Sequence, residues 1–331
     1  MPQLPTEIRR LLDHVRRQVR QKNLWQPGDR VLLACSGGRD SQAALGILQA
    51  LRPSLGHTLI VAHVDHGLQP NHGETADLVR QTAANRQLQH EQRTLKLKPG
   101  PNLEGRARTA RYRALQQMAK TLEATVIVTA HHADDQAETL LMRLARGAGL
   151  EAQAGIRLAP QNLVRPFLHL TRADLALAAQ YFQLPWLEDP SNQQLDFTRN
   201  RLRHTVLPAL EQAMPQANRG LARSAELAAE HEGALGIFIH LALTPHVQLN
   251  LPERTAILPQ HALPDHPPAR AAFLHWLCGQ LQIPPPTARA TQEWLRLTPH
   301  GQANLHRLTV TGNGRDWLFF ASDVARDLPA D

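Results

Sequence analysis

The chain has 331 residues, a formal net charge of +7, 42% hydrophobic residues and only 4% aromatic ones. This length exceeds one average domain, so we expect two domains, and the basic balance favours a polyanionic partner. The two cysteines, Cys35 and Cys278, lie far apart in the sequence, which excludes a disulfide framework and any Cys-x-x-Cys zinc or thiol-transfer pair.

The N-terminal segment is charged and amphipathic, and it has no apolar signal core. Its apolar residues recur at helical spacing from Ile8 to Val19, which predicts a first helix. An apolar run long enough to cross a membrane does not occur in the sequence. We therefore expect a cytoplasmic protein with no membrane partner.

Four short segments with strand character then alternate with helical segments. They lie at 31–35, 58–64, 91–97 and 125–130. Strands that alternate with helices predict a doubly wound, mainly parallel α/β sheet. In such sheets, ligands bind beyond the carboxyl ends of the strands.

A glycine-rich stretch follows the first of these strands and precedes a helical pattern. It reads Ser36-Gly37-Gly38-Arg39-Asp40-Ser41. A strand, a tight turn and a helix point backbone N–H groups and a positive dipole end at a phosphate, and Asp40 suits the magnesium ion of a nucleotide. No Gly-Lys-Ser/Thr follows, so this is not a Walker A sequence. The alternative is an ordinary turn in which Asp40 complements the helix dipole.

A polar cluster begins the helix after the fourth strand. Asp135 and Glu138 are three residues apart and therefore share one helical face. Two such carboxylates could bind magnesium, or hold a cationic substrate and accept its proton. A transition-metal site that includes His131 and His132 is a second interpretation, and a first turn that only complements the dipole is a third.

Three polar stretches should share one cleft because each follows a strand, namely 36–41, 63–66 and 131–138. Arginines also cluster between Arg106 and Arg113, on a helix predicted at 102–122, and between Arg199 and Arg203. Together with the glycine-rich loop they would form a positive rim for an RNA backbone. The alternative is that these charges are solvated surface.

The second half of the chain is less regular. A short edge segment at 163–168 and a helix at 171–182 come first, and a long helical stretch follows. Proline-punctuated segments then end in a hairpin that turns at Asn313-Gly314. We predict a catalytic domain at 1–215, a helical linker at 216–243 and a small α+β domain at 244–331.

Six groups of residues occur in the order found in one enzyme family. The first, S-G-G-x-D-S, is the pyrophosphate (PP) loop of enzymes that cleave ATP between its α- and β-phosphates. The others are His63-Val64-Asp65-His66-Gly67-Leu68, Asn102 to Tyr112 (with Glu104, Ala107, Arg108 and Arg111), Thr129 to Thr139, Arg165-Pro166-Phe167-Leu168, and Asp189-Pro190-Ser191-Asn192 with Arg199, Asn200 and Arg203. Over about its first 215 residues the chain resembles the tRNA(Ile)-lysidine synthetases. The remainder resembles the small C-terminal domain of shorter members, without the further domain of longer ones.

The resemblance implies a two-step, ATP-dependent ligation that releases AMP and pyrophosphate. The 2-carbonyl oxygen of the wobble cytidine in a CAU anticodon attacks the α-phosphate of ATP, which gives an adenylated base. The ε-amino group of free L-lysine then displaces AMP and leaves lysidine. The implied cofactors are ATP and Mg²⁺, and the implied partners are tRNA(Ile) and L-lysine. A homodimer is left open.

The resemblance also implies roles for individual residues. Asp135 and Glu138 would hold the lysine cation and accept its proton, and the C-terminal domain would contact tRNA. Arg108, Arg111 and Arg203 would face phosphates of ATP or tRNA. The implied catalytic residues are Asp40, Asp135, Glu138 and Arg203; the ATP-binding residues are Ser36, Gly37, Gly38, Arg39, Asp40, Ser41, His63, Arg108 and Arg111; and the metal ligands are Asp40 and Asp135.

Three other functions compete with this interpretation. A tRNA thiolase with the same loop usually needs a cysteine pair, which Cys35 and Cys278 do not make. A small-molecule amidating synthetase needs an ammonia source, and no glutaminase domain is visible in the sequence. The third is a non-catalytic RNA-binding protein with a decayed nucleotide site, but Ser36, Asp40, Asp135 and Glu138 are all present.

Overall fold

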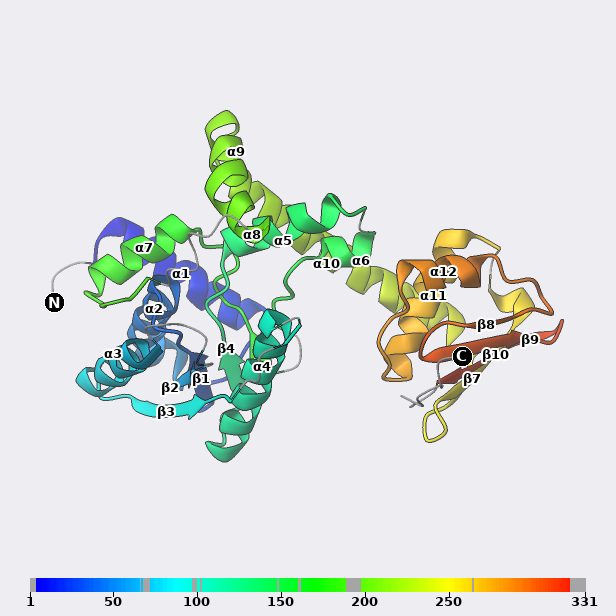
Figure 1. Ribbon diagram of the computed structural model, residues 1–331, viewed down its shortest axis with the longest axis horizontal. Coiled ribbons are helices and arrows are strands. Elements are labelled where there is room, and N and C mark those ends of the chain that lie inside the picture. The colour runs from blue at the N-terminus through cyan, green and yellow to red at the C-terminus, as the bar shows by residue number, and fades with distance from the viewer. Residues whose placement is uncertain are drawn as a thin grey trace. The chain divides into compact units, whose positions relative to one another are not determined.

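The computed structural model describes residues 4–65, 67, 72–96, 100–101, 103–147, 149–159, 162–188, 198–263 and 265–321. It divides into two compact units, unit 1 (Met1–Ala229) and unit 2 (Glu230–Asp331), which we describe separately (Figure 1). Four parts of the predicted motifs lie outside the described residues, namely His66, Leu68, Asn102 and the 189–192 segment.

Unit 1 contains a five-stranded parallel sheet in the order β3-β2-β1-β4-β5. The order places β2 on one side of β1 and β4 on the other, so the topological switch point lies between β1 and β4. The doubly wound, parallel fold that the sequence predicts is thus confirmed. The strands are β1 (Arg30–Ala34), β2 (Thr58–Asp65), β3 (Gln89–Thr94), β4 (Val126–Val128) and β5 (Leu163–Val164).

Two strands differ from their predicted limits. β3 pairs with β2 from Gln89 to Thr94, so it starts and ends earlier than the predicted segment 91–97. β4 is shorter than the predicted 125–130, because its backbone pairing with β1 ends at Val128 and the following residues turn toward a polar cleft. Strand limits are set by the partner strand, which local sequence does not reveal.

Helices cover both faces of the sheet because neighbouring strand residues point to opposite sides. Leu33 and Val61 pack into a core shared with α1, α2, α3 and α7, whereas Leu32 and Ile60 pack against Leu115 and other residues of α4. The helices of unit 1 are α1 (Thr6–Gln21), α2 (Arg39–Leu55), α3 (His72–Asn85), α4 (Leu103–Thr121), α5 (Ala133–Leu144), α6 (Leu150–Gln153), α7 (Arg172–Tyr181), α8 (Thr198–Arg201), the π-helical turn η2 (Leu202–Val206) and α9 (Leu207–Ala213).

One continuous helix, α10 (Ala217–Leu243), covers the segment predicted as a linker, and the two compact units divide inside it, after Ala229. The predicted domain limits at 215 and 244 remain predictions. Among the described residues, no helix is long and apolar enough to span a bilayer.

The described part of unit 2 contains an antiparallel sheet, the helices α11 and α12, the last turns of α10 and an aromatic core of its own. Its strands follow the order β6-β7-β10-β9-β8, and β9 and β10 form the hairpin that the sequence predicts around Asn313. The core contains Phe273, Trp294 and Phe319. The elements are β6 (Gln248–Asn250), β7 (Thr255–Pro259), η3 (Gln260–Ala262), α11 (Pro267–Gln280), α12 (Ala288–Leu295), β8 (Gln302–Asn304), β9 (Leu308–Gly312) and β10 (Asp316–Ala321).

Two neighbouring phenylalanines on β10 test this packing. Phe319 is fully buried, 5.6 Å from the rings of Phe273 and Trp294, whereas Phe320 is 46% exposed. Phe319→Ala should therefore lower the free energy of unfolding of unit 2 by about 3–5 kcal/mol, because it leaves a cavity. Phe320→Ala should change it by less than ~1 kcal/mol. Denaturant unfolding followed by tryptophan fluorescence measures both, and equal losses would contradict the strand alternation described here.

Candidate active site

The glycine-rich loop joins β1 to α2 and depends on a left-handed glycine. Gly37 has φ +83°, and a Cβ atom there would lie 2.4 Å from Thr75 Cγ2, so no other residue fits without strain. Ser41 closes the turn, since its hydroxyl accepts from the Ser36 N–H at 3.1 Å and donates to the Gly38 carbonyl at 2.9 Å. The turn therefore ends at the N-terminus of α2, in the arrangement that binds phosphates.

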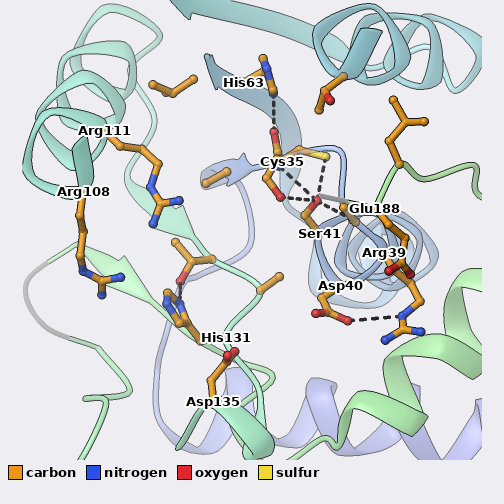
Figure 2. Close-up of a pocket in the computed structure, with 18 of the residues that line it drawn as sticks. Cys35, Arg39, Asp40, Ser41, His63, Arg108, Arg111, His131, Asp135 and Glu188 are labelled. Carbon is orange, nitrogen blue, oxygen red and sulfur yellow. Dashed lines mark hydrogen bonds and ion pairs between the residues drawn. The ribbon is translucent and has the colours of Figure 1, made fainter. Parts of the chain in front are cut away.

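This loop forms one wall of a cleft of about 540 Å³, within the size range of small-ligand sites (Figure 2). The three polar stretches expected to share a cleft all contribute to it. Of the residues proposed for the site, only Gly37 and Glu138 do not line it. Those that do are Ser36, Gly38, Arg39, Asp40, Ser41, His63, Arg108, Arg111, Asp135 and Arg203.

His63 lies near the end of β2 with its ring fixed against the β1 backbone. Its Nδ1 is 2.9 Å from the Cys35 carbonyl oxygen, so Nδ1 carries the proton and donates it. Burial lowers the pKa of His63 below its ordinary value. His63 therefore presents a neutral ring to the cleft at pH 7.

Asp40 lies in the first turn of α2 and keeps one oxygen without a hydrogen bond. Oδ1 is buried and has no hydrogen-bond partner among the described residues, although Arg39 Nε forms an ion pair with it at 3.8 Å. Oδ2 lies 3.3 Å from His132 Nε2. Burial raises the pKa of Asp40, but the hydrogen bond and charge of His132 outweigh this and lower it. Asp40 is thus an ionised carboxylate that can accept a cation.

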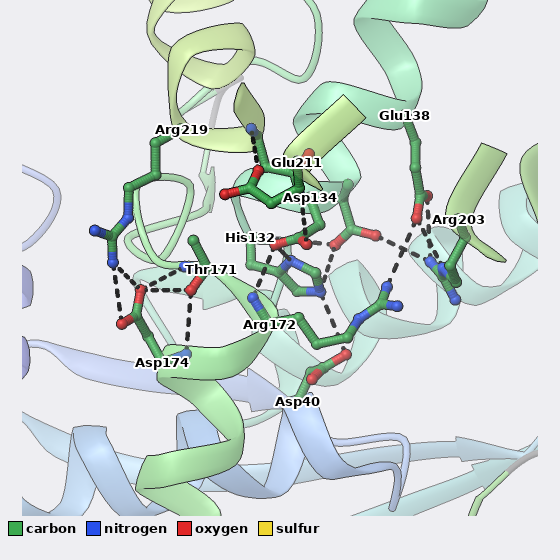
Figure 3. Close-up of polar contacts among 12 residues, drawn as sticks. Asp40, His132, Asp134, Glu138, Thr171, Arg172, Asp174, Arg203, Glu211 and Arg219 are labelled. Atoms are coloured by element: carbon green, nitrogen blue, oxygen red, sulfur yellow. Dashed lines mark hydrogen bonds and ion pairs between the residues drawn. The ribbon is translucent and has the colours of Figure 1, made fainter. Parts of the chain in front are cut away.

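The buried His132 lies among three carboxylates (Figure 3). Its Nε2 is 3.3 Å from Asp40 Oδ2 and 3.5 Å from Asp135 Oδ2, and its Nδ1 is 3.4 Å from Asp134 Oδ2. Burial alone would lower the pKa of His132, but Asp135, Asp134 and Asp40 together raise it to about 10. His132 is therefore an imidazolium at pH 7, and it links the glycine-rich loop at 36–41 (the phosphate loop) to the first turn of α5.

Asp134 extends this group to two further helices. It accepts hydrogen bonds from the Arg172 backbone N–H at 2.8 Å and from Asn218 Nδ2 at 3.0 Å. Neither Arg172 nor Asn218 is among the residues predicted from the sequence, and His132 is among them only as a possible metal ligand. A histidine two residues before a pair of aspartates was the available signal for His132, whereas nothing in the local sequence marks Arg172 or Asn218.

Two arginines from the α8–η2 segment occupy the Asp135–Glu138 pair. Arg199 donates to Glu138 Oε2 at 2.5 Å and to Asp135 Oδ1 at 2.9 Å. Arg203 donates from Nε to Glu138 Oε1 at 2.7 Å and from Nη2 to Glu138 Oε2 at 3.2 Å. The two carboxylates share one face, as predicted, and arginines of the chain itself neutralise them.

Burial raises the pKa of Asp135, but the surrounding cations, His132 foremost, hold it well below its usual range. The hydrogen bonds and charge of Glu138 overcome burial and raise the pKa of Arg203. Both groups are therefore fully charged at neutral pH. A carboxylate with such a low pKa is a weak proton acceptor while these cations remain.

Arg108 and Arg111 project from α4 into the cleft, from the side opposite the glycine-rich loop (Figure 2). Both guanidinium groups lie over the Tyr112 ring, at 5.1 Å and 5.5 Å from its centroid. Arg106 and Arg113 do not line the cleft. The arginine run thus divides into two residues that can meet an anionic ligand and two that lie outside the cleft.

The residues of the cleft fit a magnesium ion only in part. Asp40 offers Oδ1, an orphaned buried oxygen of the kind that a hard cation binds. Asp135 offers less, because Oδ1 accepts from Arg199 and Oδ2 accepts from the His132 N–H at 3.1 Å. In the part of the chain that the structure describes, no group of three or more His, Cys, Asp or Glu residues could hold a metal ion, so the transition-metal interpretation gains no support.

A parallel sheet with this loop at its switch point defines an ATP-binding protein of the PP-loop class, and the PP-loop domain family matches residues 10–210. The chain is 37% identical to a Synechococcus tRNA(Ile)-lysidine synthase over 91% of this chain and 93% of that protein. It is 38% identical to the Pectobacterium atrosepticum enzyme over 80% of this chain and 60% of that protein. The chain belongs to the tRNA(Ile)-lysidine synthase family.

Among solved structures, the U34-tRNA thiolase NcsA from Methanococcus maripaludis, determined with its 4Fe-4S cluster, superposes with a TM-score of 0.58. The match covers 68% of this chain and 80% of that one at 17% sequence identity. At this identity the likeness concerns the fold alone.

The geometry of the phosphate loop predicts that substitutions at its two glycines differ in their effect on stability. Gly37→Ala should lower the free energy of unfolding by about 1–3 kcal/mol, because alanine at positive φ is strained and its methyl group meets Thr75. Gly38→Ala should change it little, since its Cβ atom would have no neighbour closer than 3.6 Å. Urea unfolding without nucleotide measures both. An equal loss in the two variants would contradict the described loop geometry.

The His132 imidazolium predicts a specific pH dependence. Its pKa is about 10 in the folded protein against 6.5 as its ordinary value, so its charge contributes stability fully below pH 6.5 and loses that contribution as the pH rises toward 10. The stability difference between the wild type and His132→Gln should therefore be constant at acidic pH and shrink between those values. Urea unfolding over this range, in metal-free buffer, measures it. A difference that does not vary with pH would show that His132 is neutral.

Proposed function

We propose that one cleft, in unit 1, binds ATP and lysine side by side and serves both steps of lysidine formation. As a member of this family, the chain is an ATP-dependent ligase that acts on tRNA(Ile) and lysine. The observation that supports a shared cleft is the position of His132, 3.3 Å from the loop carboxylate of Asp40 and 3.5 Å from Asp135. The residue roles below are proposals.

In the first step, the 2-carbonyl oxygen of the wobble cytidine attacks the α-phosphorus of ATP. A bond forms between this oxygen and phosphorus, the bond to the bridging oxygen breaks, and pyrophosphate leaves with the electron pair. The N–H groups of Gly37 and Gly38 and the hydroxyls of Ser36 and Ser41 would hold the leaving group, beside Arg39. The uncharged ring of His63 would line part of the ATP site.

Asp40 would hold the Mg²⁺, which neutralises phosphate charge when bound. Its orphaned Oδ1 supports this role. Asp135 would have to give up a hydrogen bond from Arg199 or from the His132 backbone before it could hold a metal. We therefore assign the ion to Asp40 alone and give Asp135 a different role.

In the second step, the amine nitrogen of lysine attacks C2 of the adenylated base, the C2–O bond breaks and AMP leaves. Lysine is an ammonium ion at neutral pH, so it must lose one proton before attack. Asp135, with Glu138 behind it, would bind the ammonium and accept that proton. The low pKa of Asp135 opposes the transfer while Arg199 is bound, and removal of a neighbouring cation raises that pKa.

The tRNA would approach the open side of the cleft. A wobble base in an anticodon loop is accessible, because it is not buried in a duplex. Arg108 and Arg111 would then face phosphates of ATP or of the loop, whereas Arg203 would act through Glu138. The reaction would take place in the cytoplasm, where ATP, tRNA and free lysine occur together. Every residue in this scheme comes from unit 1, so it does not require a homodimer.

A thiolase is the strongest rival because it would use the same adenylation step. It would need a reactive cysteine pair. Cys35 is buried under the phosphate loop and burial raises its pKa, and Cys278 belongs to the separate core of unit 2. The cysteines of this chain therefore do not support sulfur transfer.

The three-component assay tests the proposed reaction. AMP and radiolabelled lysidine should form only when ATP, lysine and tRNA with a CAU anticodon are all present, because the adenylate forms on the tRNA base and AMP leaves only when lysine displaces it. Formation of AMP with glutamine or a sulfur donor in place of lysine would overturn the proposal. The lysine-labelled tRNA product can be counted directly after acid precipitation.

The same assay can test Asp135. Asp135→Asn should reduce lysine transfer on the order of a hundredfold or more, while ATP binding stays largely intact, because the amide neither pairs with an ammonium nor accepts its proton. Asp77→Asn is the matched control, since Asp77 is an exposed carboxylate that forms an ion pair with Arg80 on the same helix. Normal turnover by Asp135→Asn would remove Asp135 from the mechanism.

A further inference from the structure

The acidic pair proposed to receive lysine already holds a cation of the chain itself. Arg199 spans both carboxylates, with Nε 2.5 Å from Glu138 Oε2 and Nη2 2.9 Å from Asp135 Oδ1. A guanidinium that bridges two carboxylates satisfies them as an alkylammonium would. The site for an organic cation is therefore formed, and it is filled by a side chain.

The arginines around Glu138 are not equivalent. Arg203 makes two bonds to Glu138 and its side chain is 17% exposed, and Arg172 lies 3.6 Å from the same carboxylate at 26% exposure. Arg199 is 38% exposed, the most accessible of the three. It can leave toward solvent while Arg203 and Arg172 continue to neutralise the fully buried Glu138.

Exchange of Arg199 for an ammonium group would conserve charge. A buried carboxylate that loses its partner is strongly destabilised, so an outgoing cation must be replaced by another. Asp135 would keep the bond from the His132 N–H to Oδ2 and the longer contact of Arg203 Nη2 with Oδ1 at 3.5 Å, and the incoming ammonium would take the place of Arg199 on Oδ1. No other cation has to move.

We propose that Arg199 is an internal competitor: it occupies the ammonium subsite, and lysine must displace it in order to bind. This inference rests on the proposed function, because it assumes that lysine uses the Asp135–Glu138 pair. It makes Arg199 a specificity-determining residue. A simple amine would form the same bonds to the two carboxylates that Arg199 gives up, so the exchange brings no net gain in free energy. Only a ligand that makes further contacts in the cleft can therefore displace Arg199.

Lysine binding to the full chain tests this exchange. Equilibrium dialysis with radiolabelled lysine, in the presence of a non-hydrolysable ATP analogue and without tRNA, should give a Kd about tenfold lower for Arg199→Ala than for the wild type, because the two charge-assisted hydrogen bonds of Arg199 no longer have to be broken. Arg201→Ala is the matched control on the same short helix; its guanidinium donates to Thr198 Oγ1, and its Kd should equal that of the wild type. An unchanged or higher Kd in Arg199→Ala would overturn the inference.

Two further arms separate competition from a merely structural effect. Arg199→Lys retains a competing cation, so its Kd should return toward the wild-type value. Butylamine should compete with lysine in Arg199→Ala at concentrations that leave the wild type unaffected, because only the variant has a vacant ammonium subsite. If Arg199→Lys binds lysine as tightly as Arg199→Ala, loss of the cation is not the cause and the proposal fails.

The failure of this inference can be told from failure of the proposed function. If Asp135→Asn does not weaken lysine binding, lysine binds elsewhere and both proposals fall. If Asp135→Asn weakens it but Arg199→Ala does not strengthen it, the lysine site stands and the competition does not. Circular dichroism of each variant confirms that the chain is folded.

Discussion

The buried imidazolium of His132 is the interaction on which the site depends. Asp40, Asp134 and Asp135 come together within 3.3–3.5 Å of its ring, and without a cation between them three carboxylates at this spacing would repel one another and take up protons. The ring also joins elements that are distant in sequence, because Asp40 lies in the first turn of α2, Asp135 lies in the first turn of α5, and Asp134 bonds to α7 and α10.

This arrangement follows from the sheet. β1 and β4 are neighbours at the switch point, so the loops after them emerge together and the N-termini of α2 and α5 both face the cleft. The N-terminus of α2 would bind the pyrophosphate through backbone N–H groups of the phosphate loop, while the N-terminus of α5 carries Asp135. A nucleotide and an amine can thus be held close together, each by groups of the opposite charge. The cations that prevent repulsion among the carboxylates also keep Asp135 a weak base. The departure of Arg199 would therefore matter for proton transfer from lysine as well as for lysine binding.

Much of the fold could be predicted from local sequence. The alternation of strand and helix patterns predicted the parallel sheet. The rule that ligands bind at the carboxyl ends of strands then placed residues 36–41 and His63 in one cleft with Asp135. Register and limits could not be predicted, because β3 and β4 extend only as far as their pairing with β2 and β1. The division of the chain inside α10 also leaves no local signal, because the helical pattern continues through it.

The sequence by itself determined the phosphate loop, since Gly37 and its serine neighbours form the turn through contacts that are mostly local. It also determined that Asp135 and Glu138 share a face, because helical spacing requires it. Only the tertiary structure decided which charges they meet. Arg199 and Arg203 lie more than sixty residues further along the chain, and their pairing depends on how the α8–η2 segment packs over α5, which no local pattern encodes.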